Sequence, residues 1–190
     1  MEIFSLRGIS IFLCFCVGAQ AGEPIPLTQY QKDSIVNQLN DYRRQQGASD
    51  MYLVSWDNEL AGGAADQAAL CKFGYSAYAG MGYGETLAVI KKPTDVDDHL
   101  MSALSVWYDE INNMEEDGSC YRCGHYKQLV FAPTYKVGCG IATCPSDEKN
   151  IVCQFRQGLI AGIPTFSKGP ACSECPYYAT CHDKLCKLPW

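Results

Sequence analysis

The sequence is poor in basic residues and in histidine. Lysine and arginine total 15 against 21 acidic residues, which gives a formal net charge of −6. Proteins that bind nucleic acid carry basic patches, and simple attraction to anionic lipid surfaces also needs clustered cations, so this balance argues against both partners. Only His99, His125 and His182 can supply imidazole to a metal centre.

Long apolar runs are also scarce. The one candidate lies at the N-terminus, with Arg7 before it, an apolar centre at 9–17 and a small-x-small cleavage pattern at 19–21. This run is shorter than the roughly 20 residues that span a bilayer, so we predict a signal peptide at residues 1–21, a secreted protein and no integral membrane segment. The sequence also contains no Asn-x-Ser/Thr acceptor and no Gly-x-Ser-x-Gly nucleophile turn.

Cysteine, in contrast, is abundant. Two of the 12 cysteines fall in the predicted signal peptide, and the even remainder in an exported chain predicts five disulfides without fixing their pairing. The rival interpretation is a zinc site from the two Cys-x-x-Cys pairs, which lie too far apart for a zinc ribbon. The remaining cysteines are Cys71, Cys120, Cys123, Cys139, Cys144, Cys153, Cys172, Cys175, Cys181 and Cys186.

Hydrophobic periodicity and capping residues predict helices in the first half of the chain. A capping-box pair, Thr28 and Gln31, precedes the first apolar stripe, and Asp57 is placed to cap the second helix. Acidic residues suit the start of the third helix, on which we expect His99 to face solvent. The helices are predicted at 28–44, 57–72 and 95–110.

The second half of the chain is predicted to be β-structure. Short apolar runs bounded by turn residues indicate strands, and His125 is placed just before the first of them. The cysteine-rich tail, with His182 on its surface, needs disulfides to hold its shape. The strand candidates are 129–131, 135–144 and 151–155, and strands that follow helices in this way indicate an α+β fold.

Several motifs resemble those of the CAP superfamily, which comprises cysteine-rich secretory proteins, antigen 5 and pathogenesis-related 1 proteins. The stretch 124–134, Gly-His-Tyr-Lys-Gln-Leu-Val-Phe-Ala-Pro-Thr, is similar to the signature Gly-His-Tyr-Thr-Gln-Val-Val-Trp-x-x-Thr. In this stretch Lys127 replaces the Thr and Phe131 replaces the Trp of the signature. Trp-Asp-x-x-Leu-Ala at 56–61, Trp-Tyr-Asp-Glu at 107–110 and Gly-Pro-x-Cys-Ser-x-Cys-Pro at 169–176 also resemble the family, the last notably its helminth venom-allergen-like members.

The resemblance implies a fold and a domain organisation. It predicts a three-layer α-β-α sandwich of CAP type, with the CAP domain at residues 22–165 and a short disulfide-rich C-terminal extension at 166–190.

The resemblance also implies a central cavity that, in the family, holds two histidines and two glutamates. Glu85, Glu110 and His125 match three of these positions, and Tyr75 stands where the second histidine belongs. Without the partner imidazole, we expect no bound metal, no other cofactor and no catalytic residue. His125 is instead expected to form a hydrogen-bonded pair with Glu110 or Glu85, because a buried carboxylate needs a partner.

Lipid binding is the function that the resemblance implies. CAP proteins bind sterols near a flexible aromatic loop and fatty acids in a groove between two helices. The glycine-rich stretch 73–83 fits the loop, and its aromatic residues either form an adaptable surface or cover the sheet. Likewise, the apolar residues of the first and third helices either line a groove or belong to the core. The lipid-binding candidates are Phe73, Tyr75, Tyr78 and Tyr83 on the loop, and Ile35, Leu39, Leu100 and Leu104 on the helices.

We therefore predict a secreted, non-enzymatic binder of sterols, fatty acids or both that acts on a host. The alternative is a secreted protein ligand or allergen that binds a host receptor through surface loops. A metal-assisted hydrolase is the less favoured alternative, because its metal would have only one imidazole in the cavity.

Overall fold

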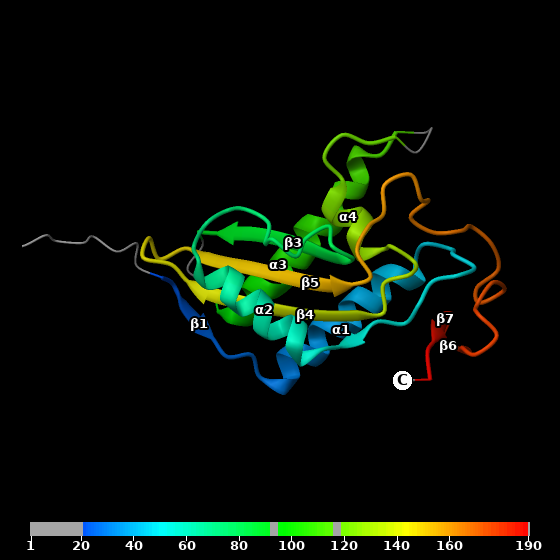
Figure 1. Ribbon diagram of the computed structural model, residues 1–190, viewed down its shortest axis with the longest axis horizontal. Coiled ribbons are helices and arrows are strands. Elements are labelled where there is room, and N and C mark those ends of the chain that lie inside the picture. The colour runs from blue at the N-terminus through cyan, green and yellow to red at the C-terminus, as the bar shows by residue number, and fades with distance from the viewer. Residues whose placement is uncertain (1–20, 92–94, 116–118, 190) are drawn as a thin grey trace, which may run out of the picture.

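A mixed β-sheet occupies the middle of the computed structural model, which describes residues 21–91, 95–115 and 119–189 (Figure 1). The strand order is β1-β4-β5-β3, antiparallel throughout, and β2 pairs in parallel with β4. The strands are β1 (Glu23–Ile25), β2 (Ser55–Trp56), β3 (Tyr83–Ile90), β4 (Lys136–Thr143) and β5 (Lys149–Arg156). The predicted signal peptide lies outside the described residues except for residue 21.

Helices cover both faces of this sheet. Helix α2 (Asn58–Ala69) lies on one face, and α1 (Gln29–Arg44), α3 (Val96–Asp109) and α4 (Gly124–Leu129) lie on the other (Figure 1). A 3-10 turn, η1 (Glu110–Asn113), follows α3, and a hairpin of β6 (Thr180–His182) and β7 (Leu185–Lys187) forms the tail. The α+β class and the three-layer sandwich are therefore confirmed. Within the described ranges, no helix has both the length and the apolar character needed to cross a membrane.

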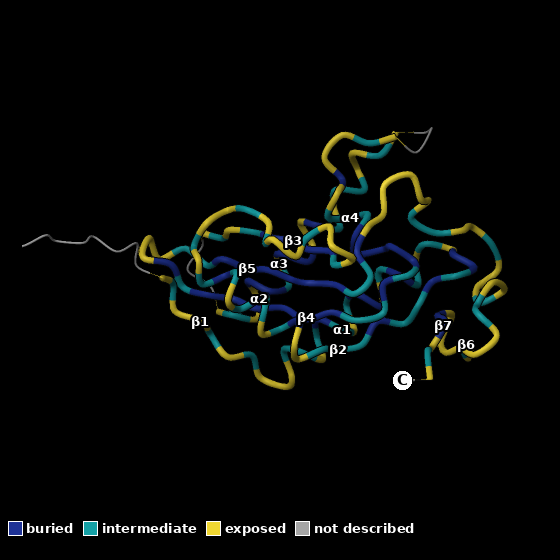
Figure 2. Tube along the Cα trace, viewed as in Figure 1, coloured by how far each residue is buried: buried dark blue, intermediate teal, exposed yellow. Residues whose placement is uncertain are grey.

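Strand β4 shows how the two faces are built. Its side chains alternate, so Val137, Cys139 and Ile141 enter the large core beneath α1 and α3. The opposite face presents Gly138 and Gly140 to α2, where a Cβ at residue 140 would lie 2.3 Å from the amide nitrogen of Ala65. Glycine is therefore required for this close approach. Figure 2 shows that the central strands are buried while much of the tail is exposed.

The helix starts agree with the sequence-based predictions. Thr28 forms both bonds of the capping box with Gln31, and Asp57 accepts hydrogen bonds from the next turn. Asp95 caps α3 by accepting a bond from the amide of residue 98. The second helix ends at residue 69 rather than 72, because Cys71 adopts a positive φ of 52° and is joined to the strand end by a disulfide.

Two of the three predicted strands, β4 and β5, are present, but residues 129–131 are not a strand. His125 instead lies in the first turn of the short helix α4, which ends at Leu129. Strand β3, which carries Glu85, was not anticipated from its sequence. The physical reason for the missing strand is Arg43, which binds the backbone carbonyls that a neighbouring strand would otherwise bind.

Arg43 is 1% exposed and has no acidic side chain among its hydrogen-bond partners. Its guanidinium donates to five carbonyl oxygens at 2.9–3.0 Å. Burial lowers the pKa of Arg43 to about 9, while Asp50 acts in the opposite direction, so the side chain stays charged at neutral pH. The accepting carbonyls belong to Tyr52, Leu129, Phe131, Ala132 and Thr134.

His99 is buried rather than facing solvent, which corrects the sequence-based prediction. It is 1% exposed and shares one face of α3 with Ala103 and Trp107. Its Nδ1 contacts the carbonyl oxygen of Asp95. The i, i+4, i+8 spacing of these three residues indicates a shared buried face. The acidic residues just before His99 had instead suggested a solvent-facing position. His182, in contrast, is exposed in the tail.

All ten described cysteines form disulfides. The two Cys-x-x-Cys motifs do not combine into a zinc site, because the tail cysteines pair within the tail and Cys120 pairs with Cys123. The bonds are Cys71–Cys144, Cys120–Cys123, Cys139–Cys153, Cys172–Cys181 and Cys175–Cys186.

Replacing Gly140 with alanine should destabilise the fold by about 1–3 kcal/mol, because α2 must move away from β4. Gly62→Ala is the matched control, since nothing lies within 4 Å of the added Cβ, and alanine in a helix should stabilise by about 0.5–1 kcal/mol. Urea unfolding of both variants measures the difference, and equal midpoints would contradict the close packing.

Arg43→Lys should lower the free energy of unfolding by at least about 3 kcal/mol, because an ammonium cannot donate to all the carbonyls that the guanidinium binds. Arg44→Lys at the next position is the control, because its ion pairs with Asp41 and Asp183 are partly exposed and should contribute less than about 1 kcal/mol. Chemical denaturation compares the two, and a loss below about 1 kcal/mol for Arg43→Lys would contradict the assigned role.

Candidate functional site

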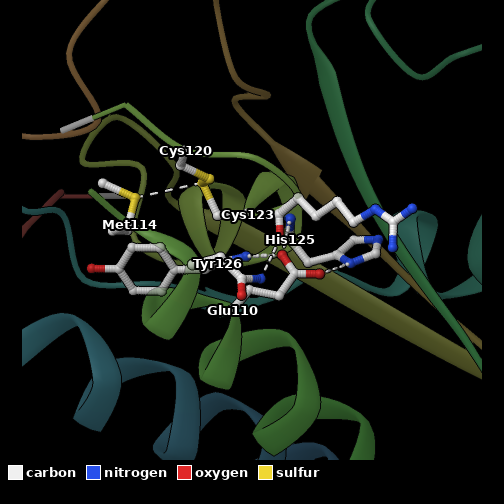
Figure 3. The surroundings of a disulfide bond; sticks show 8 residues. Glu110, Met114, Cys120, Cys123, His125 and Tyr126 are labelled. Atoms are coloured by element: carbon white, nitrogen blue, oxygen red, sulfur yellow. Dashed lines mark hydrogen bonds and ion pairs between the residues drawn. A yellow bond between two sulfur atoms is a disulfide. The ribbon is translucent and has the colours of Figure 1, made fainter.

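Glu110 lies where α3 passes into η1, and its carboxylate holds the start of α4 (Figure 3). One oxygen, Oε2, accepts from the backbone amides of His125 at 2.9 Å and Tyr126 at 3.1 Å. The other, Oε1, lies 2.7 Å from Nδ1 of His125. A negative charge at the start of a helix is favourable, because the first amides have no partner within the helix.

His125 is oriented by these contacts. Because Glu110 Oε1 can only accept when ionised, we assign the proton to Nδ1 of His125, which leaves Nε2 free to accept. The hydroxyl of Tyr75 lies 3.4 Å from that Nε2 and is placed to donate a long hydrogen bond. Burial raises the pKa of Tyr75, with smaller contributions from the charges of Glu110 and Glu85, so the hydroxyl keeps its proton.

Glu85 lies on β3 and is 8% exposed. Its Oε1 accepts from the backbone amide of Ser76 at 2.7 Å, and its Oε2 accepts from Nε2 of Gln154 at 2.9 Å. Gln154 is the direct cross-strand partner of Glu85 on β5. Glu85 is therefore bound to the loop and to the sheet, and no hydrogen bond between it and His125 is seen in the described chain.

The structure thus brings Tyr75, Glu110 and His125 into one hydrogen-bonded chain, and Glu85 contacts the segment that carries Tyr75. The expected pairing of His125 with a glutamate is with Glu110. All four side chains belong to the sequence-predicted site.

Gln128 is a further site residue that the sequence-based search missed. It is 3% exposed on α4, and its Nε2 donates to Thr134 Oγ1 at 3.1 Å and to the carbonyl of Gln157 at 3.3 Å. Its Oε1 accepts from the amide of Leu159 at 3.0 Å. Gln128 belongs to the 124–134 motif, and a buried amide in a conspicuous motif is the signal that could have identified it.

A cavity of about 240 Å³ lies beside this network. Its wall includes Glu85 and Gln128, together with the stretch 73–83, which we call the aromatic loop. Phe73 is 71% and Tyr78 66% exposed on this loop, whereas Tyr75, 60% exposed overall, directs its hydroxyl toward His125. Phe73 and Tyr78 therefore form an exposed surface rather than a cover for the sheet. The cavity is lined by Tyr75, Ala79, Gly80, Tyr83, Gly84, Glu85, Gly124, Gln128 and Leu159.

The helical lipid-binding candidates lie in the core instead. Ile35, Leu39, Leu100 and Leu104 are each at most 2% exposed, because they pack under the sheet where α1 and α3 meet. The space between those helices is a cavity of about 110 Å³ that, of the four, only Leu100 borders. This is far below the roughly 300 Å³ at which pockets for small ligands begin. The four residues therefore belong to the core in this structure, and fatty-acid binding between the two helices stays a prediction.

Comparisons with known proteins agree with the sequence motifs. Residues 36–155 match the CAP family, described as the cysteine-rich secretory protein family. The chain belongs to this family. GLIPR1-like protein 1 of Homo sapiens is 33% identical over 93% of this chain and 80% of its own length. Peptidase inhibitor 16 of Mus musculus is also 33% identical, over 87% of this chain, which spans only 35% of that relative.

Solved structures share the CAP fold. NaASP2, in a crystal structure with Zn²⁺, superposes with a TM-score of 0.74 at 22% identity and covers 84% of this chain and 96% of its own. Venom allergen-like protein 4 of Schistosoma mansoni gives a TM-score of 0.63 at 25% identity over 78% of this chain and 100% of its own. The likeness to helminth venom-allergen-like proteins that the tail motif indicated is thereby confirmed.

The residues of this CAP cavity do not fit a zinc ion. Nδ1 of His125 is bound to Glu110, and both oxygens of Glu85 are already bonded. Nε2 of His125 faces the hydroxyl of Tyr75. Because the pKa of Tyr75 is raised, this hydroxyl stays protonated and is not a phenolate ligand. Among the described residues, no cluster of three or more His, Cys, Asp or Glu side chains is arranged to hold a metal, whereas zinc sites use at least three such ligands.

Tyr75→His should therefore create zinc affinity, because it places a second imidazole beside Nε2 of His125. We expect the dissociation constant for Zn²⁺ to be at least about tenfold lower than in the original chain, measured by calorimetric titration. Tyr78→His, a nearby position on the same exposed loop, is the control. Equal zinc affinity in the two variants would refute the idea that Tyr75 alone separates this cavity from a metal site.

Proposed function

We propose that this CAP protein is a secreted, non-enzymatic binder of an apolar lipid of the sterol class, held at the aromatic loop. The observation that carries the proposal is the exposure of the loop aromatic residues beside a cavity that the same loop lines. Large exposed apolar patches are uncommon on soluble proteins and mark binding surfaces.

The loop combines fixed and exposed parts. Its start is held by Gln67, whose Nε2 donates to the carbonyl of Gly74, and by the bond from Ser76 to Glu85. Its tip turns at Gly80 and Gly82, both with positive φ, which glycine adopts without strain. The aromatic side chains are therefore presented on an anchored backbone, which lowers the entropy lost when a ligand binds.

The cavity is smaller than most ligand pockets, so part of the ligand would lie in it and part against Phe73 and Tyr78. Aromatic side chains suit such contact, because each offers a large apolar face at little cost in conformational entropy. Secretion is consistent with the five disulfides, which form and persist in oxidising compartments.

The hydrogen-bonding pattern also favours binding over catalysis. A serine nucleophile needs a base within hydrogen-bond reach. Ser76 Oγ is buried and makes no hydrogen bond within the described part of the chain. His125, the imidazole of the site, is engaged by Glu110 and Tyr75 instead.

A role as a protein ligand of a host receptor stays a prediction. The observation in its favour is Tyr177 on the disulfide-linked tail, which is 98% exposed and contacts Tyr178 edge-on. Exposed tyrosines are frequent at protein interfaces.

Cholesterol binding by the purified chain tests the sterol proposal. We expect saturable binding that the double change Phe73→Ser with Tyr78→Ser weakens at least about tenfold, because two large apolar contacts are lost. Tyr177→Ser removes an even more exposed aromatic side chain from the tail and should leave affinity unchanged. Absence of saturable binding, or equal loss in the loop and tail variants, would remove the proposal.

A further inference from the structure

The segment that follows β5, residues 159–168, forms an arch on the α4 side of the molecule (Figure 1). Beneath this C-terminal arch lies a cavity of about 680 Å³, which is within the roughly 300–1,000 Å³ of small-molecule sites. It is distinct from the cavity at the aromatic loop, although Leu159 borders both. None of the sequence-based predictions placed a function here.

Both feet of the arch are fixed to the body. At the first foot, the amide of Leu159 donates to Oε1 of Gln128 at 3.0 Å. At the second, the carbonyl of Thr165 accepts from the amide of Ala132 at 2.7 Å, and the amide of Ser167 donates to Asp50. The cavity is therefore supported on both sides before any ligand arrives, which reduces the ordering cost of binding.

The crest of the arch is apolar and exposed. Leu159 is 38%, Ile160 44% and Ile163 52% exposed, and all three line the cavity together with Phe166 and Met114. A turn closed by the bond from the Ile163 amide to the Ile160 carbonyl holds the crest. Aliphatic side chains grouped around a hollow indicate an apolar ligand rather than a solvated loop.

The charge of the cavity wall is opposite to that of the chain. Lys127 from α4 and Lys168 from the end of the arch line it, and no acidic residue is among its described lining residues. Neither lysine forms an ion pair within the described ranges, in a chain whose net charge is −6. Two unpaired ammonium groups beside an apolar hollow are complementary to an anionic amphiphile.

We propose that the C-terminal arch binds a single-chain lipid phosphate, an amphiphile with one acyl chain and a phosphate monoester. Lysine binds phosphate as a point charge, and a phosphate monoester carries about −1.5 to −2 charges at neutral pH, which two lysines balance. The acyl chain packs against the isoleucines and Phe166 under the arch. The site is independent of the proposed sterol site, because Leu159 is the only described lining residue that the two cavities share.

The test uses residues 22–190, without the predicted signal peptide, and 1-palmitoyl glycerol 3-phosphate below its micellar concentration. We expect saturable binding at least about tenfold tighter than that of neutral 1-palmitoyl glycerol or of palmitate, and no saturation by inorganic phosphate. Removing two carbons from the acyl chain should weaken binding by up to roughly fourfold per carbon. Equal affinity for the neutral lipid or for palmitate, or binding only to vesicles, overturns the proposal.

Variants locate the ligand. Lys127→Gln with Lys168→Gln should weaken lipid-phosphate binding at least about tenfold, and Ile160→Ser with Ile163→Ser should do the same. Lys187→Gln, an exposed lysine on the tail hairpin, is the charge control and should bind like the original chain. Unchanged affinity in the double lysine variant overturns the proposal. Thermal unfolding of each variant shows that the loss does not come from misfolding.

The two proposed sites fail separately. Phe73→Ser with Tyr78→Ser should leave lipid-phosphate affinity unchanged, and the arch variants should leave cholesterol affinity unchanged. Loss of lipid-phosphate binding in the aromatic-loop variant would place that ligand at the aromatic loop and overturn the arch site. Lipid-phosphate binding without cholesterol binding supports the arch and removes only the sterol proposal.

Discussion

A buried guanidinium without a carboxylate in contact is the constraint on which this molecule depends. Arg43 leaves α1, passes through the core and binds carbonyls at the end of α4 and in the irregular segment that follows it. Leaving such a charge unsatisfied would cost several kcal/mol, so the 129–134 segment has little freedom to adopt another path. The position of α4, which precedes this segment, follows from it.

The same constraint extends to both proposed sites. Helix α4 carries His125 at its start, where Glu110 binds it. One turn later it carries Gln128, whose side-chain amide oxygen anchors the first foot of the arch. Ala132, whose carbonyl Arg43 binds, uses its amide to hold the second foot. One short helix and the turn after it therefore connect the aromatic-loop cavity to the arch cavity, and both are built on backbone that Arg43 fixes.

Much of the fold could be predicted because its signals are local. Capping residues and helical periodicity identified the starts of α1, α2 and α3, and an even number of cysteines indicated the disulfides. The arrangement of Glu110, His125 and Tyr75 followed from motif resemblance. The errors came from contacts between distant positions. Arg43 and Leu129 are 86 residues apart, and no pattern within 129–131 could show that an arginine would bind its carbonyls. The apolar stripes predicted on α1 and α3 are present. Their spacing does not show whether they face the core or a groove, which only their burial in the folded chain decides.

No disulfide among the described residues joins the tail to the sandwich. Cys172–Cys181 and Cys175–Cys186 both close within the tail, and the other three bonds close within the sandwich. The tail is attached to the sandwich by the arch and by backbone bonds such as those between Met51, Leu53 and Cys186. A single proteolytic cut in the arch would leave the tail held by non-covalent contacts only.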